Sequence, residues 1–388
     1  MNVYAEVWRK REYSFGGMEE RMEKKRIAVL FGGCSPEYGV SLESAHSVMT
    51  HMDRRKYEVF PVGITKTGGW YAYEGDWGRI LQDEWFSRER CKRAALLPDR
   101  NEDGRGRFLV FRENGTEETA IDAVFPVLHG RNGEDGTVQG LCELAGVPVA
   151  GCTMIASALG MDKDRAHRLA ASAGVSVPES VVVRKQEFME GKSVMPPDFP
   201  VFVKPVRAGS SFGITKVTSQ EGICAALEKA FSYDDEAIVE QAVPGFEVGC
   251  AVMGNERLIT GAVDEIELKD GFFDYAEKYG LVTSKIHVPA RISGQKAREI
   301  QKTAKKIYRA LGCRGFARVD MFLTPEGKVV FNEVNTIPGF TAHSRFPGMM
   351  RAAGWPLEAV VDQAIGLALG AEAADAGEGE GAWALEDG

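Results

Sequence analysis

The sequence predicts a protein of mixed α/β and α+β class, in which an open parallel sheet comes first and two smaller mixed units follow. From Lys25 onward, apolar strands alternate with helices, which is the pattern of open parallel sheets. Beyond Gly151, short strands alternate with glycine- and serine-rich turns, and no internal repeat is present. We therefore expect several domains rather than one continuous sheet.

Five segments are expected along the chain, each with its own composition. They are an extension that is disordered or non-native (1–24), an N-terminal α/β domain (25–150), a central subdomain (151–241), a C-terminal subdomain (242–370) and a disordered acidic tail (371–388). The extension has no strand or helix periodicity. The tail is rich in Ala, Gly and Glu, and therefore has too little apolar surface to fold.

The N-terminal sheet is expected from three apolar runs. Ile27–Phe31 is continuously apolar, as in a strand buried on both faces, and Gly32-Gly33 then turns the chain toward a helix. The two further strands are expected at Tyr57–Ile64 and Ala120–Leu128. Because ligands bind beyond the carboxyl ends of such strands, Glu37 and His129 are candidate site residues.

The later elements follow from the same patterns. The central segment is expected to contain helices at Ile155–Ala173 and Gly222–Phe231 and strands at Phe202–Lys204, Ile214–Val217 and Ala237–Glu240. The C-terminal segment is expected to contain strands at Glu247–Met253, Leu258–Ile266, Ala317–Leu323 and Val329–Glu333, and helices at Gly294–Leu311 and Pro356–Leu369.

Composition and charge exclude several classes of protein. The chain is 44% hydrophobic and 27% charged, which is ordinary for a soluble globular protein. Its net charge of −9 leaves no general attraction for nucleic acid or an anionic membrane. No apolar run is long enough to span a bilayer, no signal-peptide pattern is present, and the seven cysteines form no CxxC pair. We expect a cytoplasmic protein with reduced thiols.

The strongest constellation is GFARVDMF…VVFNEVNTIPG. Glu333 and Asn335 lie two residues apart on one strand and therefore share a face, and Asp320 on the neighbouring strand can join them. Three oxygen ligands suit Mg²⁺, which keeps phosphates and waters as its other ligands. Arg318 shares the face of Asp320 and can stabilise a transferring phosphoryl group. Taken singly, each acid is more simply an exposed strand end.

Two further stretches point to a nucleotide. In VFVKPVRAGSSFGITKV, an apolar strand reaches Lys204, and a loop with Ser210 and Ser211 can then cradle phosphate oxygens, with Lys163 as a second cation. No GK[ST] helix follows, so this is not a Walker A loop. In IVEQAVPGFEVG, Glu240, Val243 and Glu247 can meet adenine and ribose, although a plain turn at Pro244-Gly245 explains the stretch equally well. A surface lysine is also often only solvated.

Together these motifs resemble those of the D-alanine–D-alanine ligase family of ATP-grasp enzymes, from about Lys25 to Leu369. The stretches FGGCSPEYGVSLESA, FPVLHGRNGEDGTVQG and MDKDRAH resemble the same family. The resemblance implies an ATP-grasp fold with ATP between the central and C-terminal subdomains. It also implies a homodimeric ligase that activates D-alanine as an acyl phosphate for peptidoglycan synthesis.

The resemblance assigns roles to individual residues. Those expected to hold ATP are Lys163, Lys204, Ser211, Glu240, Val243, Glu247 and Lys278, and those expected to hold two Mg²⁺ ions, with Mn²⁺ as an alternative, are Asp320, Glu333 and Asn335. Glu37 would bind the ammonium of the first D-alanine, with His129 close by and Ser210 linking Glu37 to Tyr279. Arg318 and the Gly339 amide would bind the oxyanion, and Ser344 the carboxylate of the second substrate. The chain departs from the family pattern at Gly39, Ala208 and Gln241.

A lid over the site is expected at 269–285, because two glycines and four aromatic residues stand there between defined strands. The alternative is a partly packed surface loop. The Lys278-Tyr279 pair in this segment favours an amino acid over a hydroxy acid as second substrate, because family members that use D-lactate generally lack it.

Three other positions lean away from D-alanine as the second substrate. Arg345 stands where an apolar residue is common in the family, Phe273 stands where Tyr is common, and Asp264 can face Arg345. The combination resembles the vancomycin-resistance D-alanine–D-serine ligases of VanG type. The alternatives are a D-alanine–D-alanine ligase and a non-catalytic ATP-binding protein on the same fold, and Asp264 with Arg345 can also be a purely structural ion pair.

Overall fold

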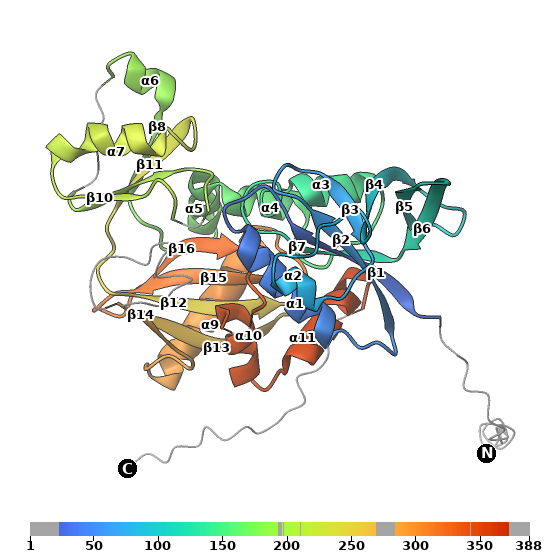
Figure 1. The fold of residues 1–388 in the computed structure, drawn as a ribbon. Coiled ribbons are helices and arrows are strands. Elements are labelled where there is room, and N and C mark those ends of the chain that lie inside the picture. The colour runs from blue at the N-terminus through green and yellow to red at the C-terminus, as the bar shows by residue number, and fades with distance from the viewer. Residues whose placement is uncertain are drawn as a thin grey trace, which may run out of the picture.

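The computed structural model describes residues 23–192, 196, 198–209, 211–268, 284–341 and 343–371. Most of the expected extension, lid and tail lie outside the described residues, as do Ser210, Phe273, Lys278 and Tyr279. The described chain forms three sheets with helices packed around them (Figure 1). The predicted α/β and α+β class is therefore confirmed. Within the described part of the chain, no helix is long and apolar enough to cross a membrane.

The N-terminal sheet has seven strands in the order β6-β5-β4-β3-β2-β1-β7. Its strands are β1 (Lys25–Gly32), β2 (Tyr57–Ile64), β3 (Trp70–Tyr73), β4 (Cys91–Arg100), β5 (Gly106–Arg112), β6 (Gly115–Ile121) and β7 (Ala123–Val127), and its helices are α1 (Tyr38–His51), α2 (Gly78–Leu81) and α3 (Thr137–Leu144). Only β1 pairs in parallel, with β2 and β7, and the other pairs are antiparallel. The expected parallel sheet is thus the centre of a mixed one.

One expected strand divides in two. The run Ala120–Leu128 ends one strand and begins another, with Asp122 between them. The Asp122 backbone N–H donates to the Arg26 carbonyl at 2.8 Å, and its carboxylate accepts the Arg26 N–H at 2.8 Å. The aspartate side chain therefore hydrogen-bonds to the edge of β1 at the point where the chain stops pairing with β5 and begins to pair with β1. Apolar content alone does not reveal such a break.

The central segment forms a four-stranded antiparallel sheet in the order β10-β9-β11-β8. Its elements are α4 (Met154–Met161), α5 (Lys163–Ser172), β8 (Ser180–Arg184), α6 (Lys185–Met189), β9 (Val201–Pro205), β10 (Thr215–Val217), a 3₁₀ turn (Gln220–Gly222), α7 (Ile223–Ala230) and β11 (Glu236–Gln241). The single helix expected at Ile155–Ala173 is wrong. Asp162 interrupts it, because its side chain accepts the Arg165 N–H at 2.9 Å and caps a new helix.

The C-terminal segment forms a five-stranded antiparallel sheet in the order β14-β13-β12-β15-β16. Its elements are β12 (Phe246–Met253), β13 (Ile259–Leu268), β14 (Ser284–His287), α9 (Gly294–Ala310), β15 (Phe316–Leu323), β16 (Val329–Asn335), α10 (Arg345–Ala352) and α11 (Leu357–Ala368). Alternate residues of β12 belong to two different cores on opposite sides of the sheet, since Val248 shares a core with Ile300 of α9 and Ala251 shares a core with Met349 of α10.

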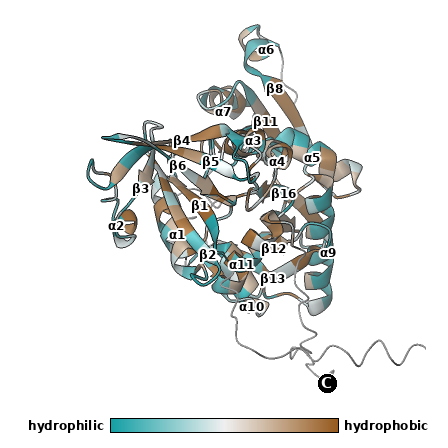
Figure 2. Ribbon diagram, turned by 90° about the vertical axis from the view of Figure 1, so that its right-hand side faces the viewer, coloured by the Kyte–Doolittle hydropathy of each residue, from teal (hydrophilic) through white to brown (hydrophobic). Residues whose placement is uncertain are grey.

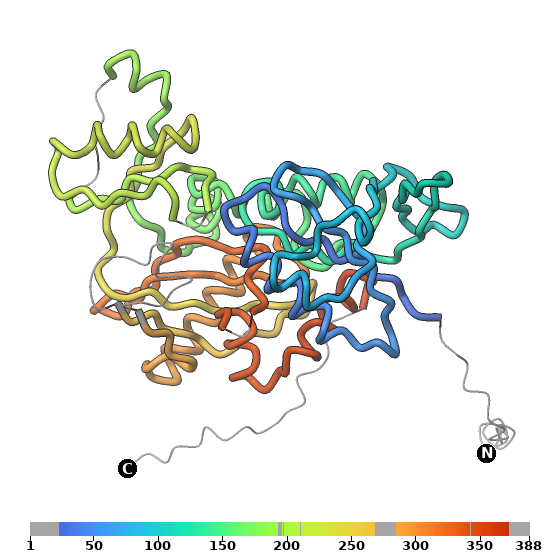
Figure 3. Tube along the Cα trace, in the orientation of Figure 1, coloured from blue at the N-terminus to red at the C-terminus, as the bar shows by residue number. Residues whose placement is uncertain are grey.

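The hydrophobic core joins segments that are far apart in the sequence. The ring of Phe125 on β7 lies 5.8 Å from that of Phe340, which lies 5.4 Å from that of Phe316. The last helix, α11, runs beside α1 and β7 (Figure 3). By contrast, the four-stranded sheet and α7 have a core of their own. Figure 2 shows the apolar strands enclosed between more polar helices.

Candidate active site

Two cavities meet where the three sheets come together. The first, about 250 Å³, is lined among others by Glu37, His129, Lys163, Arg318, Glu333, Asn335, Gly339, Ser344 and Arg345. The second, about 850 Å³, is lined among others by Lys163, Lys204, Ser211, Glu240, Val243, Glu247 and Glu333. Lys163 and Glu333 line both cavities. The structure therefore brings most of the described candidate residues to one continuous space.

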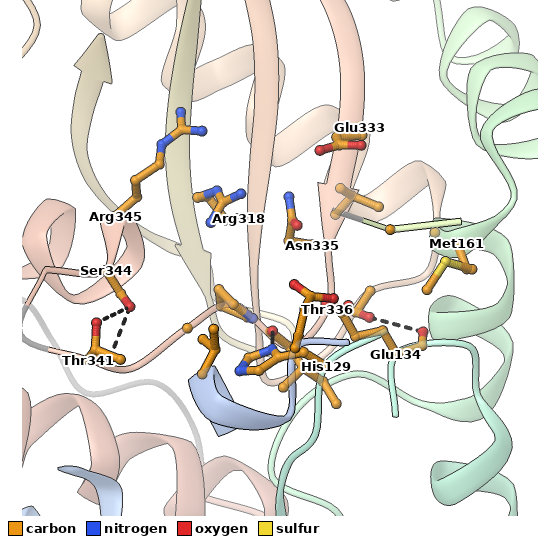
Figure 4. Close-up of a pocket in the computed structure, with 18 of the residues that line it drawn as sticks. His129, Glu134, Met161, Arg318, Glu333, Asn335, Thr336, Thr341, Ser344 and Arg345 are labelled. Carbon is orange, nitrogen blue, oxygen red and sulfur yellow. Dashed lines mark hydrogen bonds between the residues drawn. The ribbon is translucent and has the colours of Figure 1, made fainter. Parts of the chain in front are cut away.

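The predicted metal ligands share one face of the β15–β16 pair. Asp320 lies directly opposite Glu333, and Arg318 lies opposite Asn335. Opposite residues in antiparallel strands project to the same side. Asn335 donates to Asp320 Oδ2 at 2.9 Å, and Arg318 forms a two-pronged pair with Asp320 at 2.9 and 2.8 Å. Figure 4 shows Arg318, Asn335 and Glu333 side by side along the cavity.

Arg345 is a buried cation that contacts three acids. Its guanidinium holds both oxygens of Asp264 at 2.7 and 2.8 Å, Glu247 at 2.7 Å and Asp320 at 3.4 Å. The expected pairing of Asp264 with Arg345 is thus present. Asp264 is fully buried and lines neither cavity, so it can act on a ligand only through Arg345.

A glycine on β12 makes room for this pair. A side chain at Gly249 would place its Cβ 2.4 Å from Arg345 Nη2 and 2.7 Å from Asp264 Oδ1. The pair is therefore built into the packing between β12, β13 and α10.

The turn after β16 brings Gly339 and Ser344 together. Ser344 Oγ accepts the Thr341 N–H at 3.0 Å and lies 2.8 Å from the Thr341 hydroxyl (Figure 4). A Cβ at Gly339 would lie 2.6 Å from Ser344 Oγ, so the close approach requires glycine. Both residues line the first cavity beside Arg345.

Glu37 and His129 lie at the carboxyl ends of β1 and β7, as expected. Glu37 immediately precedes α1, and both side chains are at least nine-tenths buried. His129 Nδ1 lies 3.0 Å from the Ile337 carbonyl, which can only accept, so Nδ1 carries the proton. Burial lowers the pKa of His129 against the opposing charge of Glu37. Its Nε2 is therefore an acceptor, and it is buried with no hydrogen-bond partner among the described residues.

The second cavity contains a tight ion pair. Lys204 Nζ on β9 lies 2.5 Å from Glu240 Oε2 on β11, and Lys163 Nζ donates to the Ala208 carbonyl at 2.7 Å. Burial would raise the pKa of Glu240, but the charges of Lys204, His167 and Lys163 outweigh it and lower the pKa. Ser211 has a φ of 59°, which bends the loop after β9 at the cavity wall.

Comparison with known proteins identifies the fold that carries these cavities. Family models described as D-ala D-ala ligase N-terminus and D-ala D-ala ligase C-terminus match residues 26–152 and 169–366. The chain belongs to the D-alanine–D-alanine ligase family. The expected ATP-grasp fold is thereby confirmed, and the protein is a member of a family of ATP-dependent ligases.

Three relatives of this ligase illustrate how far the likeness extends. The crystal structure of the VanG D-Ala:D-Ser ligase from Enterococcus faecalis is 51% identical, covers 89% of this chain and 100% of its own, and has a TM-score of 0.81. The vancomycin B-type resistance protein VanB of Enterococcus faecalis is 45% identical, covering 90% of this chain and 99% of VanB. A putative D-alanine–D-lactate ligase of Streptomyces coelicolor is also 45% identical, with the same shares covered.

Among the residues in or beside the ligase cavities that the sequence did not predict are Glu134 and His167. Glu134 lines the first cavity and accepts the Gly130 N–H at 2.8 Å, and burial together with the charge of Glu37 raises its pKa to about 8. His167 lies behind the second cavity beside Glu240. Both stand in stretches with family-like motifs, HGRNGEDG and MDKDRAH, and a buried polar residue within such a motif is the signal that could have found them.

The described residues offer no alternative to the predicted metal ligands on the β15–β16 face. Across the described ranges, His, Cys, Asp and Glu side chains form no group of three or more that could hold a metal ion. The predicted set uses an amide, Asn335, as its third oxygen donor. Two carboxylates and an amide on one face are hard oxygen ligands, which fit Mg²⁺.

Proposed function

We propose that this ligase joins D-alanine to D-serine through a D-alanyl phosphate, for peptidoglycan precursors that confer vancomycin resistance. The observation that carries the proposal is the junction of the two cavities at Lys163 and Glu333. It gives a nucleotide and an amino acid access to the same group of charged side chains. The likeness to the VanG D-Ala:D-Ser ligase and to VanB supports the substrate and the resistance role.

The first cavity suits D-alanine at its Glu37 end. The ammonium of the substrate would meet the Glu37 carboxylate and the bare Nε2 of His129, which both accept hydrogen bonds. The substrate carboxylate would then point toward the junction. Ser210 and Tyr279 are proposed to complete this end by linking to Glu37, as the family resemblance implies.

The second cavity suits ATP. Adenine would lie against the backbone near Val243 and the ribose near Glu247, while Lys163, Lys204 and Ser211 would hold the phosphates, with Glu240 fixing Lys204. Lys278 of the lid is proposed as a further phosphate contact. Asp320, Glu333 and Asn335 would hold two Mg²⁺ ions, or Mn²⁺. When bound, the ions supply neutralisation of phosphate charge at the junction.

The chemistry follows from this placement. The D-alanine carboxylate attacks the γ-phosphate, the bond to the β-phosphate oxygen breaks, and ADP leaves. The amine of the second substrate then attacks the acyl carbon and expels phosphate. Arg318 and the Gly339 amide would stabilise the oxyanion of this step, and Ser344 would hold the carboxylate of the second substrate. Closure of the lid at 269–285 would exclude water, which otherwise hydrolyses the acyl phosphate.

The preference for D-serine is expected to be modest. A polar pocket rejects a substrate that lacks a hydroxyl by about 10⁴-fold only when its polar groups are then left unpaired. Arg345 is already paired with Asp264, Glu247 and Asp320. When D-alanine binds instead of D-serine, Arg345 is therefore not left unpaired. The same observation favours D-alanine–D-alanine ligase as the second candidate.

Product analysis at equal concentrations of D-alanine, D-serine and D-lactate, with ATP and Mg²⁺, tests the proposal. We expect D-alanyl-D-serine as the main product by mass spectrometry. A majority of D-alanyl-D-alanine or D-alanyl-D-lactate would contradict the choice of acceptor. ADP release that does not depend on D-alanine would contradict the ligase function itself and support a non-catalytic ATP-binding protein.

We also propose that the enzyme works as a cytoplasmic homodimer. Both the dimer and the location rest on the family resemblance. Light scattering of the purified protein measures the first, and fractionation of cells that produce it measures the second. A monomer, or enrichment in the membrane fraction, would contradict them respectively.

A further inference from the structure

His167 on α5 lies between the two sheets that enclose the second cavity. It is 3% exposed. On one side its Nε2 lies 2.8 Å from the Asn332 carbonyl on β16, and on the other its Nδ1 lies 3.8 Å from Glu240 Oε1 on β11. One side chain thus contacts the five-stranded sheet and faces the four-stranded sheet.

The contact with β16 lies next to a proposed metal ligand. A carbonyl can only accept, so His167 Nε2 is the donor in this bond. Asn332 immediately precedes Glu333, and the His167 ring also packs edge-on against Phe331, with centroids 5.5 Å apart. The bond therefore fixes the backbone from which the Glu333 side chain reaches the junction of the cavities.

The contact with β11 lies behind the proposed phosphate lysine. Glu240 Oε2 pairs with Lys204, whereas Glu240 Oε1 and His167 Nδ1 have no hydrogen-bond partner among the described residues and face one another. Their separation is too long for a hydrogen bond but lies within ion-pair range. The His167 ring therefore lies directly between the Lys204–Glu240 pair and the Asn332 carbonyl.

We propose that His167 is a positioning residue for the nucleotide, which sets the spacing between the Lys204–Glu240 pair and Glu333. The inference rests on the proposed function, because it assumes that the second cavity binds ATP. His167 lines neither cavity and touches no substrate. Its effect is exerted by holding a cation from one sheet and a carboxylate from the other at the spacing that the phosphates require.

Equilibrium binding of ADP with Mg²⁺, measured by calorimetry on full-length variants, tests this role. His167→Gln keeps a donor where Nε2 stands, and we expect its Kd to stay within about threefold of wild type. His167→Ala loses the bond, and we expect Kd to rise about tenfold, the size of one buried hydrogen bond. If His167→Ala does not fold, His167→Asn replaces it, because its shorter amide does not reach Asn332. In turnover, KM for ATP is expected to rise more than kcat falls.

Arg168→Ala is the matched control, since Arg168 is the next residue of α5 and its side chain is 74% exposed. We expect it to bind ADP as wild type does. Wild-type affinity in His167→Ala with only a lower Tm, or equal losses in the Gln and Ala variants, would overturn the positioning role. Wild-type protein that binds ADP but shows no D-alanine-dependent ADP release would instead refute the proposed function and leave the His167 comparison intact.

Discussion

Two buried charge clusters, one around Arg345 and one around Lys204, lie beside the joined cavities, and they differ in how completely they are paired. The acceptor-side cluster consists of Arg345 with Asp264, Glu247 and Asp320, and Arg318 holds the far side of Asp320. The nucleotide-side cluster consists of Lys204, Glu240 and His167, in which Glu240 Oε1 and His167 Nδ1 have no hydrogen-bond partner among the described residues. The charges of the first cluster are paired with one another, whereas two polar atoms of the second cluster make no hydrogen bond to the described residues.

The difference predicts that the two clusters respond differently to the loss of one charged partner. A buried ion adds little net stability when it is paired, but removal of one partner strands the other and is costly. The acceptor-side cluster should therefore respond to substitution mainly through stability. The nucleotide-side cluster, whose lysine lines a cavity, should respond mainly through ligand affinity.

The largest effect is expected for Arg345→Leu. It strands Asp264, which is fully buried, and we expect it to lower the free energy of unfolding by about 3–5 kcal/mol. Urea unfolding followed by circular dichroism measures the loss. Because this variant is destabilised, any shift of its acceptor preference toward D-alanine has to be measured under conditions in which the protein is folded.

The double variant Asp264→Asn with Arg345→Leu is the control for stranded charge. It removes the buried anion together with its cation, so we expect it to recover at least half of the lost stability. If the unfolding free energy of Arg345→Leu alone lies within about 1 kcal/mol of wild type, the pairing within the acceptor-side cluster does not contribute to stability as proposed.

A smaller structural effect is expected for Glu240→Gln. Lys204 loses its partner but faces a cavity that water can enter, so we expect a loss of about 1–2 kcal/mol in unfolding free energy. KM for ATP should rise about tenfold, because the lysine is no longer held in place. Steady-state kinetics and the same unfolding assay measure both. A stability loss equal to that of Arg345→Leu would erase the contrast between the clusters.

The effect that depends most on pH is expected for Glu134→Gln, at an acid whose burial is compensated by a proton and not by a cation. Because folding raises the pKa of Glu134 to about 8, the folded state holds its proton more tightly, and wild type loses stability as pH rises from about 5 to 8. The variant lacks this loss. We expect its Tm to be close to that of wild type at pH 5 and to exceed it increasingly as the pH rises to 9.

Melting curves across this pH range, with the exposed Glu179→Gln as control, measure the effect. A constant Tm difference between Glu134→Gln and wild type at all pH values would rule out the shifted pKa as its cause.

Local patterns predicted much of the fold and of the site. The β15–β16 pair could be predicted because period-2 spacing sets the face of Glu333 and Asn335 without any knowledge of distant residues. The two elements that were wrongly expected to be continuous are each divided by a single polar residue. Asp122 and Asp162 redirect the chain through side-chain bonds to backbone that composition does not show.

Long-range pairing set the limit of prediction within the site. The Asp264–Arg345 pair was expected, but the further contacts of Arg345 with Glu247 and Asp320 depend on how β12, β15 and α10 meet. Glu134 and His167 were missed for the same reason, since their environments are built by Glu37 and Glu240, which are distant in sequence. The residue types suggested which side chains take part in binding or catalysis. Only the packing revealed which of them form ion pairs and hydrogen bonds with one another.

The aromatic contact between Phe125 and Phe340 has a practical consequence for dissecting this enzyme. The N-terminal sheet and the C-terminal helices share one core, and Tyr57 also donates to Asp362 of α11 at 2.8 Å. A fragment that stops after the first domain would expose that apolar face to water and invite aggregation. Truncated variants should therefore keep both the N-terminal sheet and the C-terminal helices. The four-stranded sheet with α7 has a separate hydrophobic core, and it is the unit that can be removed or exchanged.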